Sequence, residues 1–311
     1  MADLDISIAG ELNLDLILYG LPAQLIPERE LLAQGMALTL GASSAIVAHN
    51  LAALGTRVGF CSKIGNDAMG EIALNRLREA GVDVSRVQKV TNGINTGLTV
   101  ILQHGAWRNI LTYLGTIAQL RYEDLDFDYL ASARHFHLSS FYLQAALRPG
   151  IPELFRRLKE AGVTISLDTN DDPGGEWGRD LLAALRYVDV FLPNEREAKQ
   201  AMQTDNLENA ITKLARIVGV VAVKLGEKGS LAQRGKERFT CQPVKVNVVD
   251  PVGAGDSFDA GFLSQYVKGA DLEACLIAGN LAGAFSTTAA GGTEAFRDKA
   301  SREGFWRENQ H

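Results

Sequence analysis

Cysteine is scarce in this sequence, and its spacing forms no pattern. Three residues, Cys61, Cys241 and Cys275, are spread over 311 positions. An odd, widely spaced set excludes a disulfide framework and a CxxC metal pair, and a reducing cytoplasm is the simplest setting for it. His135 and His137 could share one strand face, but the sequence offers no further zinc ligands near them. We therefore expect a cytoplasmic protein without a zinc centre.

Long apolar runs and an excess of positive charge are also absent. No run reaches the ~18 apolar residues that a membrane span needs, and the first five residues are acidic where a secretory signal would be basic. With 31 Lys and Arg against 37 Asp and Glu, the formal net charge is -6. This charge disfavours a general nucleic-acid binder or a polybasic membrane-surface protein. We expect neither nucleic acid nor membrane as a partner.

The sequence does contain an alternation of strand and helix patterns, in a chain long enough for one large domain with a smaller attachment. The predicted strands are 6–10, 57–63, 134–138, 163–168, 188–192 and 219–225. The predicted helices are 42–54, 67–80, 151–161, 207–217, 256–267 and 271–289, of which the last two close the fold. The alternation favours an α/β fold with a parallel sheet between two helical layers, and antiparallel strands from residues 230–248 at the sheet edge.

A second group of strand patterns stands apart from this alternation. Residues 12–20 and 36–41 are typical of strands, and residues 97–114 are typical of a hairpin that turns at residues 103–105. We expect them to form a small separate β-sheet. The expected division is a main α/β domain of residues 1–11, 42–95 and 116–311, and a β-sheet lid of residues 12–41 and 96–115.

Residues 250–258 (DPVGAGDSF) are the most informative stretch of the chain. Two glycines flank an alanine, a carboxylate follows, and a helical pattern begins. The start of a helix leaves backbone N–H groups unpaired, and glycines let a ligand approach the backbone closely. The stretch therefore predicts an anion cradle. Asp256 at its mouth suits a base for a hydroxyl that attacks a phosphate, although a helix cap is the alternative.

Polar residues and a glycine follow several predicted strands at the point where each strand ends. They are Asn13, Asp15, Asp168, Asn170, Asn194, Glu197 and Gly226. Ligands of open α/β sheets bind beyond the carboxyl ends of the strands. We therefore expect these residues to gather along one edge, together with the cradle.

The stretch at 250–258 resembles the Asp-Thr-x-Gly-Ala-Gly-Asp-x-Phe motif of the ribokinase-like (PfkB) carbohydrate kinases. Other segments are similar to further motifs of that family, in the same order along the chain. They are residues 41–55 (GASSAIVAHNLAALG), 63–70 (KIGNDAMG), 193–197 (PNERE) and 223–229 (VKLGEKG). The resemblance covers the length of the chain. It implies a ribokinase-like three-layer fold with a small β-sheet lid and an ATP-dependent sugar kinase that uses Mg²⁺.

The resemblance also implies roles for the cradle and the ATP side. Asp256 would be the catalytic base, and the backbone of Gly253, Ala254 and Gly255 would hold the transferring phosphoryl oxygens. Asn194 and Glu197 would help to place Mg²⁺ and the phosphates, in part through water. The remaining ATP-side residues would be Lys224, Gly226, Gly229 and Asn280.

Two of these ATP-side assignments have plain structural alternatives. Pro193, a capping Asn194 and Glu197 in the first turn fit an ordinary helix start equally well. Asn280 could flank the adenine, or it could be a polar residue in a helix of small residues. The residues alone leave both alternatives open.

On the acceptor side, Asn13 and Asp15 have the alternate spacing that places both on one face of an extended segment. The resemblance implies that Asp15 accepts hydrogen bonds from acceptor hydroxyls, because a carboxylate can bind two adjacent O–H donors. Solvation in a loop is the alternative. Asp250 and the carbonyl of Val252 are implied as ligands of K⁺, although Asp250 could simply tie down its turn.

The sequence departs from the family pattern next to Gly41. The family motif has a second glycine, followed four residues later by an asparagine that contacts the acceptor in sugar-binding members, whereas this chain has Ala42 and Ile46. Losing a donor and an acceptor from the pocket alters specificity, so ribose and fructose are in doubt. Asn50, one helical turn further on, either takes over part of that contact or is a surface residue.

The lid segment contains Trp107 and Arg108. Arg108 could reach a charged group on the acceptor, which would suit a sugar acid or a phosphosugar, or it could be solvated. Lids of this family often pair two chains, so the resemblance implies a homodimer. Besides the sugar kinase we keep a nucleoside kinase and a nucleotide-binding regulatory protein with a decayed acceptor site. A dehydrogenase is disfavoured because no GxGxxG turn follows the first strand.

Overall fold

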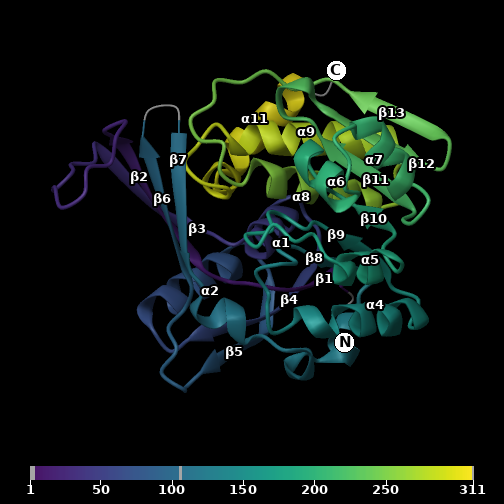
Figure 1. Ribbon diagram of the computed structural model, residues 1–311, viewed down its shortest axis with the longest axis horizontal. Coiled ribbons are helices and arrows are strands. Elements are labelled where there is room, and N and C mark those ends of the chain that lie inside the picture. The colour runs from purple at the N-terminus through teal and green to yellow at the C-terminus, as the bar shows by residue number, and fades with distance from the viewer. Residues whose placement is uncertain (1–3, 105–106, 310–311) are drawn as a thin grey trace.

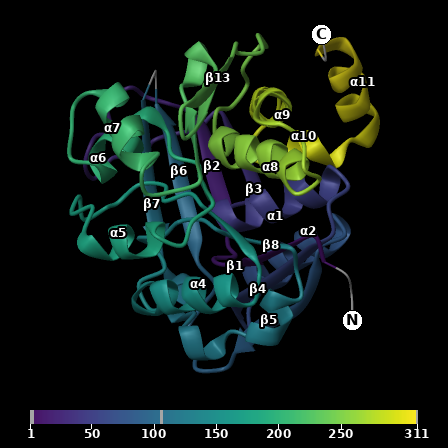
Figure 2. The same ribbon diagram turned by 90° about the vertical axis from the view of Figure 1, so that its right-hand side faces the viewer.

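The computed structural model of the protein describes residues 4–104 and 107–309. Gly105, in the predicted hairpin turn, lies outside the described residues. The described chain forms two sheets, a nine-stranded sheet with helices around it and a four-stranded sheet that stands to one side of it (Figure 1). Figure 2 shows the same arrangement from the side.

The large sheet has the strand order β13-β12-β11-β10-β9-β8-β1-β4-β5. Its strands from β11 to β5 pair in parallel, and β12 and β13 add antiparallel strands at one edge. The strands are β1 (Ile6–Ala9), β4 (Val58–Gly65), β5 (Asp83–Val90), β8 (His135–Leu138), β9 (Thr164–Leu167), β10 (Val190–Phe191), β11 (Val220–Lys224), β12 (Ser230–Arg234) and β13 (Glu237–Cys241). The predicted parallel sheet with an antiparallel edge is confirmed.

The helices cover both faces of this sheet, and a separate apolar core lies on each face. On one face α4, α5, α6 and α7 pack against the strands, and on the other α1, α2, α8 and α9 do so. The helices are α1 (Ser43–Ala53), α2 (Ala68–Glu79), α3 (Phe127–Ala131), α4 (Ile151–Glu160), α5 (Arg179–Leu185), α6 (Glu195–Ala201), α7 (Leu207–Leu214), α8 (Ala254–Tyr266), α9 (Leu272–Ser286), α10 (Glu294–Arg297) and α11 (Lys299–Asn309). Burial of apolar side chains on both faces drives this three-layer arrangement.

The small sheet has the order β3-β2-β6-β7 and corresponds to the predicted lid sheet. Its strands are β2 (Leu14–Leu21), β3 (Gly35–Leu40), β6 (Leu98–His104) and β7 (Trp107–Tyr113). Strands β2 and β6 pair in parallel, while β3 and β7 are antiparallel to them. The chain runs directly from β1 into β2, so the lid begins at the carboxyl edge of the large sheet.

Several expectations about single elements are wrong. Strand β5 and helices α10 and α11 are absent from the prediction, although α10 and α11 follow the helix that was expected to close the fold. Both β5 and α11 are rich in charged and polar residues and bury little, so they lack the apolar periodicity that marks an element in a sequence. The predicted antiparallel segment 230–248 ends early, because β13 stops at Cys241. Among the described residues, no helix has the length and apolar character to cross a membrane.

Candidate active site

The first turn of α8 forms the predicted cradle. Gly253 has φ 73°, and a Cβ there would lie 2.5 Å from the Cα of Gly292, so a larger residue does not fit. The N–H of Ala254 is directed at the carbonyl of Pro251, at 3.3 Å. The N–H groups of Gly255 and Asp256 pair with no other residue in the described ranges. These two N–H groups, at the positive end of a 13-residue helix, are the open donors of the cradle.

Asp256 lies at the mouth of this turn, and its environment favours a base that works near neutral pH. Asp256 is 8% exposed to solvent. Burial first, and then the neighbouring charge of Asp168, raise the pKa of Asp256 to about 6. Asn170 Nδ2 lies 3.4 Å from one carboxylate oxygen, and the hydroxyl of Ser43 also bonds to the carboxylate. A general base is most effective when its pKa is close to the working pH.

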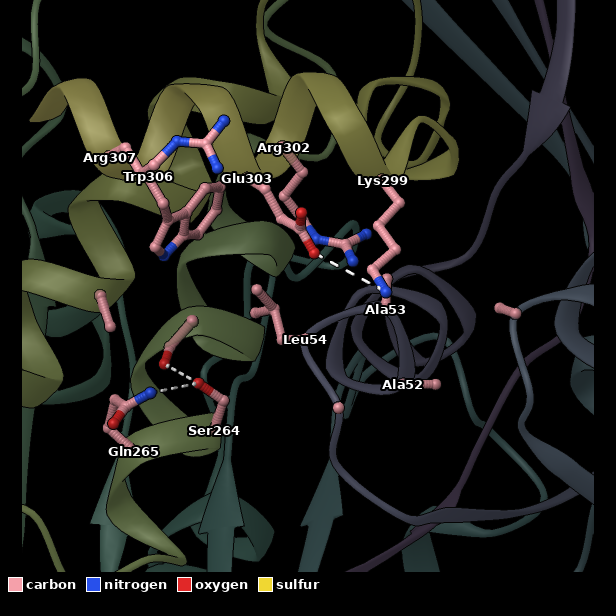
Figure 3. A pocket seen from close by; sticks show the side chains of 14 residues that line it. Ala52, Ala53, Leu54, Ser264, Gln265, Lys299, Arg302, Glu303, Trp306 and Arg307 are labelled. Atoms are coloured by element: carbon pink, nitrogen blue, oxygen red, sulfur yellow. Dashed lines mark hydrogen bonds and ion pairs between the residues drawn. The ribbon is translucent and has the colours of Figure 1, made fainter.

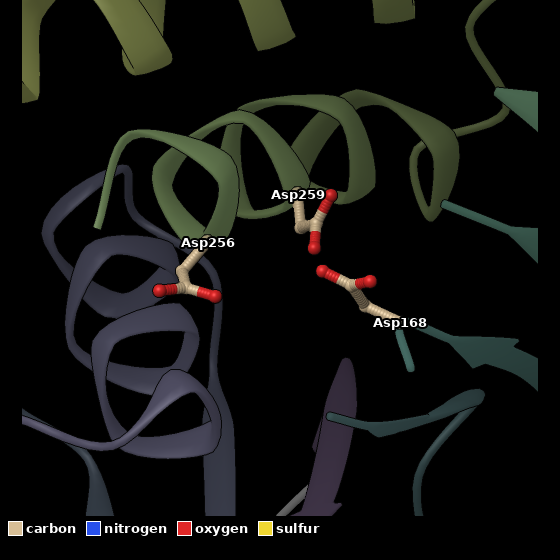
Figure 4. Close-up of side chains that lie close together, drawn as sticks. All are labelled: Asp168, Asp256 and Asp259. Carbon is tan, nitrogen blue, oxygen red and sulfur yellow. The ribbon is translucent and has the colours of Figure 1, made fainter. Parts of the chain in front are cut away.

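A cluster of buried carboxyl groups and one lysine lies next to Asp256. Oxygens of Asp168, Asp256 and Asp259 lie within 4.8 Å of one another, from the end of β9 and from α8 (Figure 4). Lys224, at the end of β11, places its Nζ 2.7 Å from Asp168 and 3.1 Å from Asp259. The sequence placed Lys224 on the ATP side, and in the structure its ammonium group is directed at these two carboxylates. Its stem passes under the cradle, with Nζ 3.6 Å from where a Cβ on Gly255 would be.

The charges of this cluster are interdependent. Burial would lower the pKa of Lys224, but the carboxylates of Asp168, Asp259 and Glu197 raise it overall, so the ammonium stays charged. Burial would likewise raise the pKa of Asp168, which Lys224 and a hydrogen bond from Asp259 hold below its usual range. Burial raises the pKa of Asp259 well above its usual range. The ammonium of Lys224 therefore faces two carboxyl groups that differ, because the site favours the ionised form of Asp168 and disfavours that of Asp259.

Asn194 and Glu197 form a capping box at the start of α6. Asn194 Oδ1 accepts from the Glu197 N–H, and the Glu197 carboxylate accepts from the N–H and the Nδ2 of Asn194. The helix-start interpretation of these residues is confirmed. Glu197 is also buried, and burial and Asp168 raise its pKa to about 7. An isolated bridge between Asn194 and Lys224 ties this helix start to the end of β11.

Asp15 approaches the same site from the lid side. Burial raises its pKa to about 7, with further contributions from the charges of Asp256 and Asp250. Gly41 packs against it, because a Cβ at Gly41 would lie 2.0 Å from Asp15 Oδ1. The Gly41 N–H bonds to the carbonyl of Asn13, whose own side chain bonds to the Leu14 carbonyl. Asp15, Asn170 and Glu197 thus lie with Asp168 near the cradle, as the sequence predicts, whereas the Asn13 side chain is taken up by the Leu14 carbonyl.

The two departures from the family motif lie next to the cradle. Ala42 has φ 65°, a conformation that favours glycine. Ile46 is 2% exposed and packs against Gly253 and Gly292. Asn50 is fully buried, so the surface alternative for this residue is wrong. Its Nδ2 donates to Ser257 Oγ and to the Gly292 carbonyl, so it anchors the cradle helix and is not directed at an acceptor.

Asp250 ties its turn and joins the lid to the main sheet. Its carboxylate accepts hydrogen bonds from the N–H groups of Val252 and Gly291, at 2.9 and 3.0 Å. It also accepts from the hydroxyl of Tyr19 on lid strand β2, at 2.8 Å. The alternative in which Asp250 holds its turn is therefore confirmed. Through the bond from Tyr19, Asp250 also connects the lid to this turn.

The remaining ATP-side residues lie around the turn after β11. Gly226 and Gly229 have φ 59° and 83°. A Cβ at Gly229 would overlap the carbonyl of Cys241, so this turn requires glycine. Asn280 donates to the carbonyls of Cys241 and Gln242 and so links α9 to the end of β13.

A cavity of about 390 Å³ lies under the lid, beside the cradle loop. Its lining residues are Ile17, Ile101, Gln103, Trp107, Arg108, Asp250, Pro251 and Val252. The two lid residues that the sequence singled out thus line the same cavity as the loop that carries Asp250.

Sequence reasoning missed three residues of this site: Asp259, Tyr19 and Ser43. Asp259 follows Asp256 by three positions on α8, and that spacing places both on one helix face, so a signal existed. The sequence gives no signal for Tyr19 or Ser43, because their roles depend on contacts of the lid and of α1 with the cradle loop, which lies far away in the chain. A near-neutral carboxylate beside open helix N–H donors suits removal of a proton from a hydroxyl that attacks a phosphate.

The chain matches the model of the pfkB family carbohydrate kinases over residues 4–299. It is 31% identical to a 2-dehydro-3-deoxygluconokinase from Bacillus subtilis, over 81% of this chain and 82% of the relative. It is also 31% identical to an ATP-dependent ribose-1-phosphate kinase from Halopiger xanaduensis, over 82% of each chain. A solved structure, adenosine kinase from Sinorhizobium meliloti, superposes with a TM-score of 0.84 and 26% identity, over 97% of this chain and all of that one.

The family match includes the cradle and the strand ends that surround it. The family uses ATP and Mg²⁺ and transfers phosphoryl groups to hydroxyl acceptors. The protein belongs to the pfkB family of carbohydrate kinases and is a phosphotransferase with an alcohol group as acceptor.

Proposed function

We propose that the protein transfers the γ-phosphoryl group of ATP to a hydroxyl of a sugar-like acceptor that carries a negative charge and binds under the lid. The observation that carries the reaction is Asp256, a buried carboxylate with a pKa of about 6 in the first turn of a helix with open N–H donors. The observation that carries the acceptor class is Arg108, which lines the cavity between the lid and the cradle loop.

In this mechanism Asp256 accepts the proton of the attacking hydroxyl. The backbone N–H groups of the turn at Gly253, Ala254 and Gly255, with that of Asp256, stabilise negative charge on the transferring group, which is usually the largest electrostatic contribution. The ammonium of Lys224 beneath the turn offsets part of the negative charge of the carboxylates there, which favours the approach of a polyanion. Asp15 accepts hydrogen bonds from acceptor hydroxyls and so orients them.

The residues present fit Mg²⁺, a cation that prefers oxygen ligands and often keeps its waters. Glu197 is a buried carboxyl with a raised pKa, and a nearby cation would favour its ionised form. Glu197 and Asn194 would hold Mg²⁺ through water, and the bound ion would neutralise phosphate charge. Nucleotide-side contacts would come from Lys224, Gly226, Gly229 and Asn280. For K⁺ we propose the carbonyl of Val252 beside Asp250, whose carboxylate is already taken up by its turn and by Tyr19.

The acceptor class also has support from two relatives. The names of the 2-dehydro-3-deoxygluconokinase and the ribose-1-phosphate kinase specify acceptors with a carboxylate and a phosphate. A guanidinium binds either group through paired, charge-assisted hydrogen bonds. Ile46 also supports a charged acceptor. Its buried apolar side chain supplies no hydrogen bond to a hydroxyl of a neutral sugar.

The lid supports a further proposal, a homodimer that forms through its exposed face. Large apolar side chains that share one face of the sheet by strand alternation are more than half exposed: Met36 66%, Trp107 75%, Leu111 52% and Tyr113 56%. An apolar patch of this kind on a sheet is typical of an interaction surface. Sedimentation of the wild-type protein beside a Met36→Ser, Leu111→Ser double variant tests the dimer.

The decisive experiment is ATP turnover across a panel of sugars, sugar acids, phosphosugars and nucleosides, with Mg²⁺ and with either Na⁺ or K⁺. We expect turnover with a charged acceptor, and Arg108→Gln should raise its KM about tenfold or more while kcat changes little. Exposed Arg234 on β12 is the matched control, and Arg234→Gln should leave KM unchanged. Turnover with a nucleoside alone would replace this proposal with a nucleoside kinase, and ATP binding without any turnover would favour a regulatory protein.

A further inference from the structure

A second cavity, the rear cavity, lies among helices α1, α8, α9 and α11. It measures about 770 Å³, which is within the range of small-molecule sites. In Figure 3, Lys299, Arg302, Glu303 and Trp306 project from α11 toward α1 and α8. Ser264 lies eight residues after Asp256 on α8, and a rise of 1.5 Å per residue makes that about 12 Å along the helix. The rear cavity is therefore distinct from the site described above.

The wall of the rear cavity is positive, in a protein with a net charge of -6. Helix α11 supplies Lys299, Arg302 and Arg307 against a single carboxylate, Glu303, which lies 3.7 Å from Lys299. In the part of the chain that the structure describes, no carboxylate forms an ion pair with Arg302 or Arg307. A concave surface of one charge concentrates ligands of the opposite charge.

Arg302 is the residue of this wall that most favours binding of an anion. Its guanidinium is partly buried and donates to the carbonyl of Phe296, at 2.9 Å. Burial lowers the pKa of Arg302, because nearby carboxylates do not compensate for the lost hydration. A partly buried charge that pairs with no carboxylate retains part of its desolvation cost, and an anion that binds it recovers that free energy.

The opposite wall of the rear cavity is small and apolar. It includes Ala52 and Ala53 from α1 and Gly261 and Ala278 from α8 and α9, and Trp306 adds an aromatic ring. Such a surface accommodates the carbon body of a ligand whose charged group faces the arginines. Arginine binds phosphate through two parallel hydrogen bonds, which makes phosphate the anion that this wall fits best.

A hydrogen-bonded path leads to the cradle from His49, which lines a smaller cavity next to the rear cavity. This smaller cavity, of about 300 Å³, shares Arg302 and Ala53 with the rear cavity. His49 Nδ1 lies 2.9 Å from Asn50 Oδ1, and Asn50 Nδ2 donates to Ser257 and Gly292 beside the cradle. Helix α8 is a second connection, because its first turn is the cradle and its second half lines the rear cavity.

We propose that the rear cavity binds a small phosphorylated ligand and that this ligand regulates phosphoryl transfer at Asp256. Its phosphate pairs with Arg302 and Arg307, and its body packs on Trp306 and the small residues of α1 and α8. Movement of Arg302 toward the ligand is transmitted through His49 and Asn50 to the loop at Gly292. The inference goes beyond the proposed function, since binding at this site is measurable whatever the acceptor is.

Binding is tested by calorimetry with inorganic phosphate, pyrophosphate and glycerol 3-phosphate, on protein whose ATP site is saturated with ADP and Mg²⁺. We expect Arg302→Gln and Arg307→Gln to weaken binding about tenfold, as for a lost charge-assisted hydrogen bond. Glu303→Gln should tighten binding about threefold, and Arg234→Gln should change nothing. Arg307 forms no hydrogen bond or ion pair with another residue of the described chain, so Arg307→Gln remains informative if Arg302→Gln unfolds. The proposed site would be overturned if all four variants bound the probes as tightly as the wild-type protein, or if the wild-type protein bound no probe.

Regulation is tested by kcat/KM with and without the probe that binds best, at constant ionic strength. The wild-type enzyme should change at least threefold, and Arg307→Gln should not change. An unchanged wild-type rate on a saturated rear cavity would overturn the regulatory role. If the proposed kinase reaction itself is wrong, turnover is absent with and without the probe, while calorimetry still reports binding.

Discussion

The catalytic edge of this protein buries charged side chains, whereas the lid exposes apolar ones. At the edge, Asp168, Asp256 and Asp259 are buried, and the partly buried Lys224 forms ion pairs with Asp168 and Asp259. In the lid, every residue of β7 is exposed, and the outer face of the sheet is apolar. Contacts between the two regions include the bond from Tyr19 to Asp250 and the packing of Thr39 on β3 against Gly291.

This difference indicates which part of the function can change easily. A buried charge cluster is coupled throughout, so replacement of one member disturbs all the others. A lid whose pocket-lining residues lie outside this cluster can change them without disturbing the proton-accepting group. On this basis, we expect the edge to keep the reaction constant and the lid to accommodate different acceptors.

The largest expected effect is at the base itself. Asp256→Asn removes the proton acceptor and keeps the size of the side chain, and the loss of a general base costs about 10²–10⁴-fold in kcat. Steady-state kinetics with the best acceptor of the panel measures this loss, and circular dichroism confirms the fold. A folded Asp256→Asn protein with near-normal turnover would show that the edge does not carry the reaction.

The next effect tests the charge cluster. Lys224→Met leaves Asp168 buried without its cation, so we expect a loss of about 3–5 kcal/mol in the free energy of unfolding, measured in guanidinium chloride. The matched control is Lys89→Met, which breaks an exposed ion pair with Glu71 and should cost at most about 1 kcal/mol. If Asp168→Asn is combined with Lys224→Met, much of the stability should return. Equal effects of Lys224→Met and Lys89→Met would remove the contrast between the two regions.

The sequence predicted the parts of this site that are local in the chain. The glycines of residues 250–258, the carboxylate at Asp256 and the capping pair Asn194 and Glu197 lie within a few residues of one another, so backbone rules suffice for them. The convergence of strand ends on one edge was also predictable, because parallel strands share that edge.

The unpredicted part consists of contacts between segments far apart in the chain. Lys224 meets Asp168 across 56 positions, and Tyr19 meets Asp250 across 231. Such pairs depend on the register of strands and on helix rotation, which periodicity does not specify. Asn50 shows the same limit, since it was interpreted as an acceptor contact or a surface residue and in fact anchors the cradle helix.

A smaller effect concerns stability against pH. The folded pKa of Asp256, about 6, lies above its ordinary value of 3.8, so the ionised form is costly in the folded protein. The contribution of Asp256 to stability is therefore greatest below about pH 4 and is lost as the pH rises through 6. Asp256→Asn lacks this titration, so it should gain about 1–3 kcal/mol over the wild-type protein between pH 4 and pH 7.5. Thermal unfolding of both proteins across this range measures the difference, and a constant difference would contradict the raised pKa.

The smallest expected effect is at the junction between the two regions. Tyr19→Phe removes the hydroxyl that bonds to Asp250 but keeps the ring, and Asp250 retains its bonds from Val252 and Gly291. A typical hydrogen bond contributes about 0.5–1.5 kcal/mol, which corresponds to about a two- to tenfold change. Because the bond positions the lid and does not touch the base, the change should fall on the KM of the acceptor and leave kcat nearly unaltered. Tyr113→Phe, on the exposed lid face, is the control and should change neither. A drop in kcat for Tyr19→Phe would mean that the lid also sets the geometry of the cradle, and the separation of reaction from recognition would then fail at this bond.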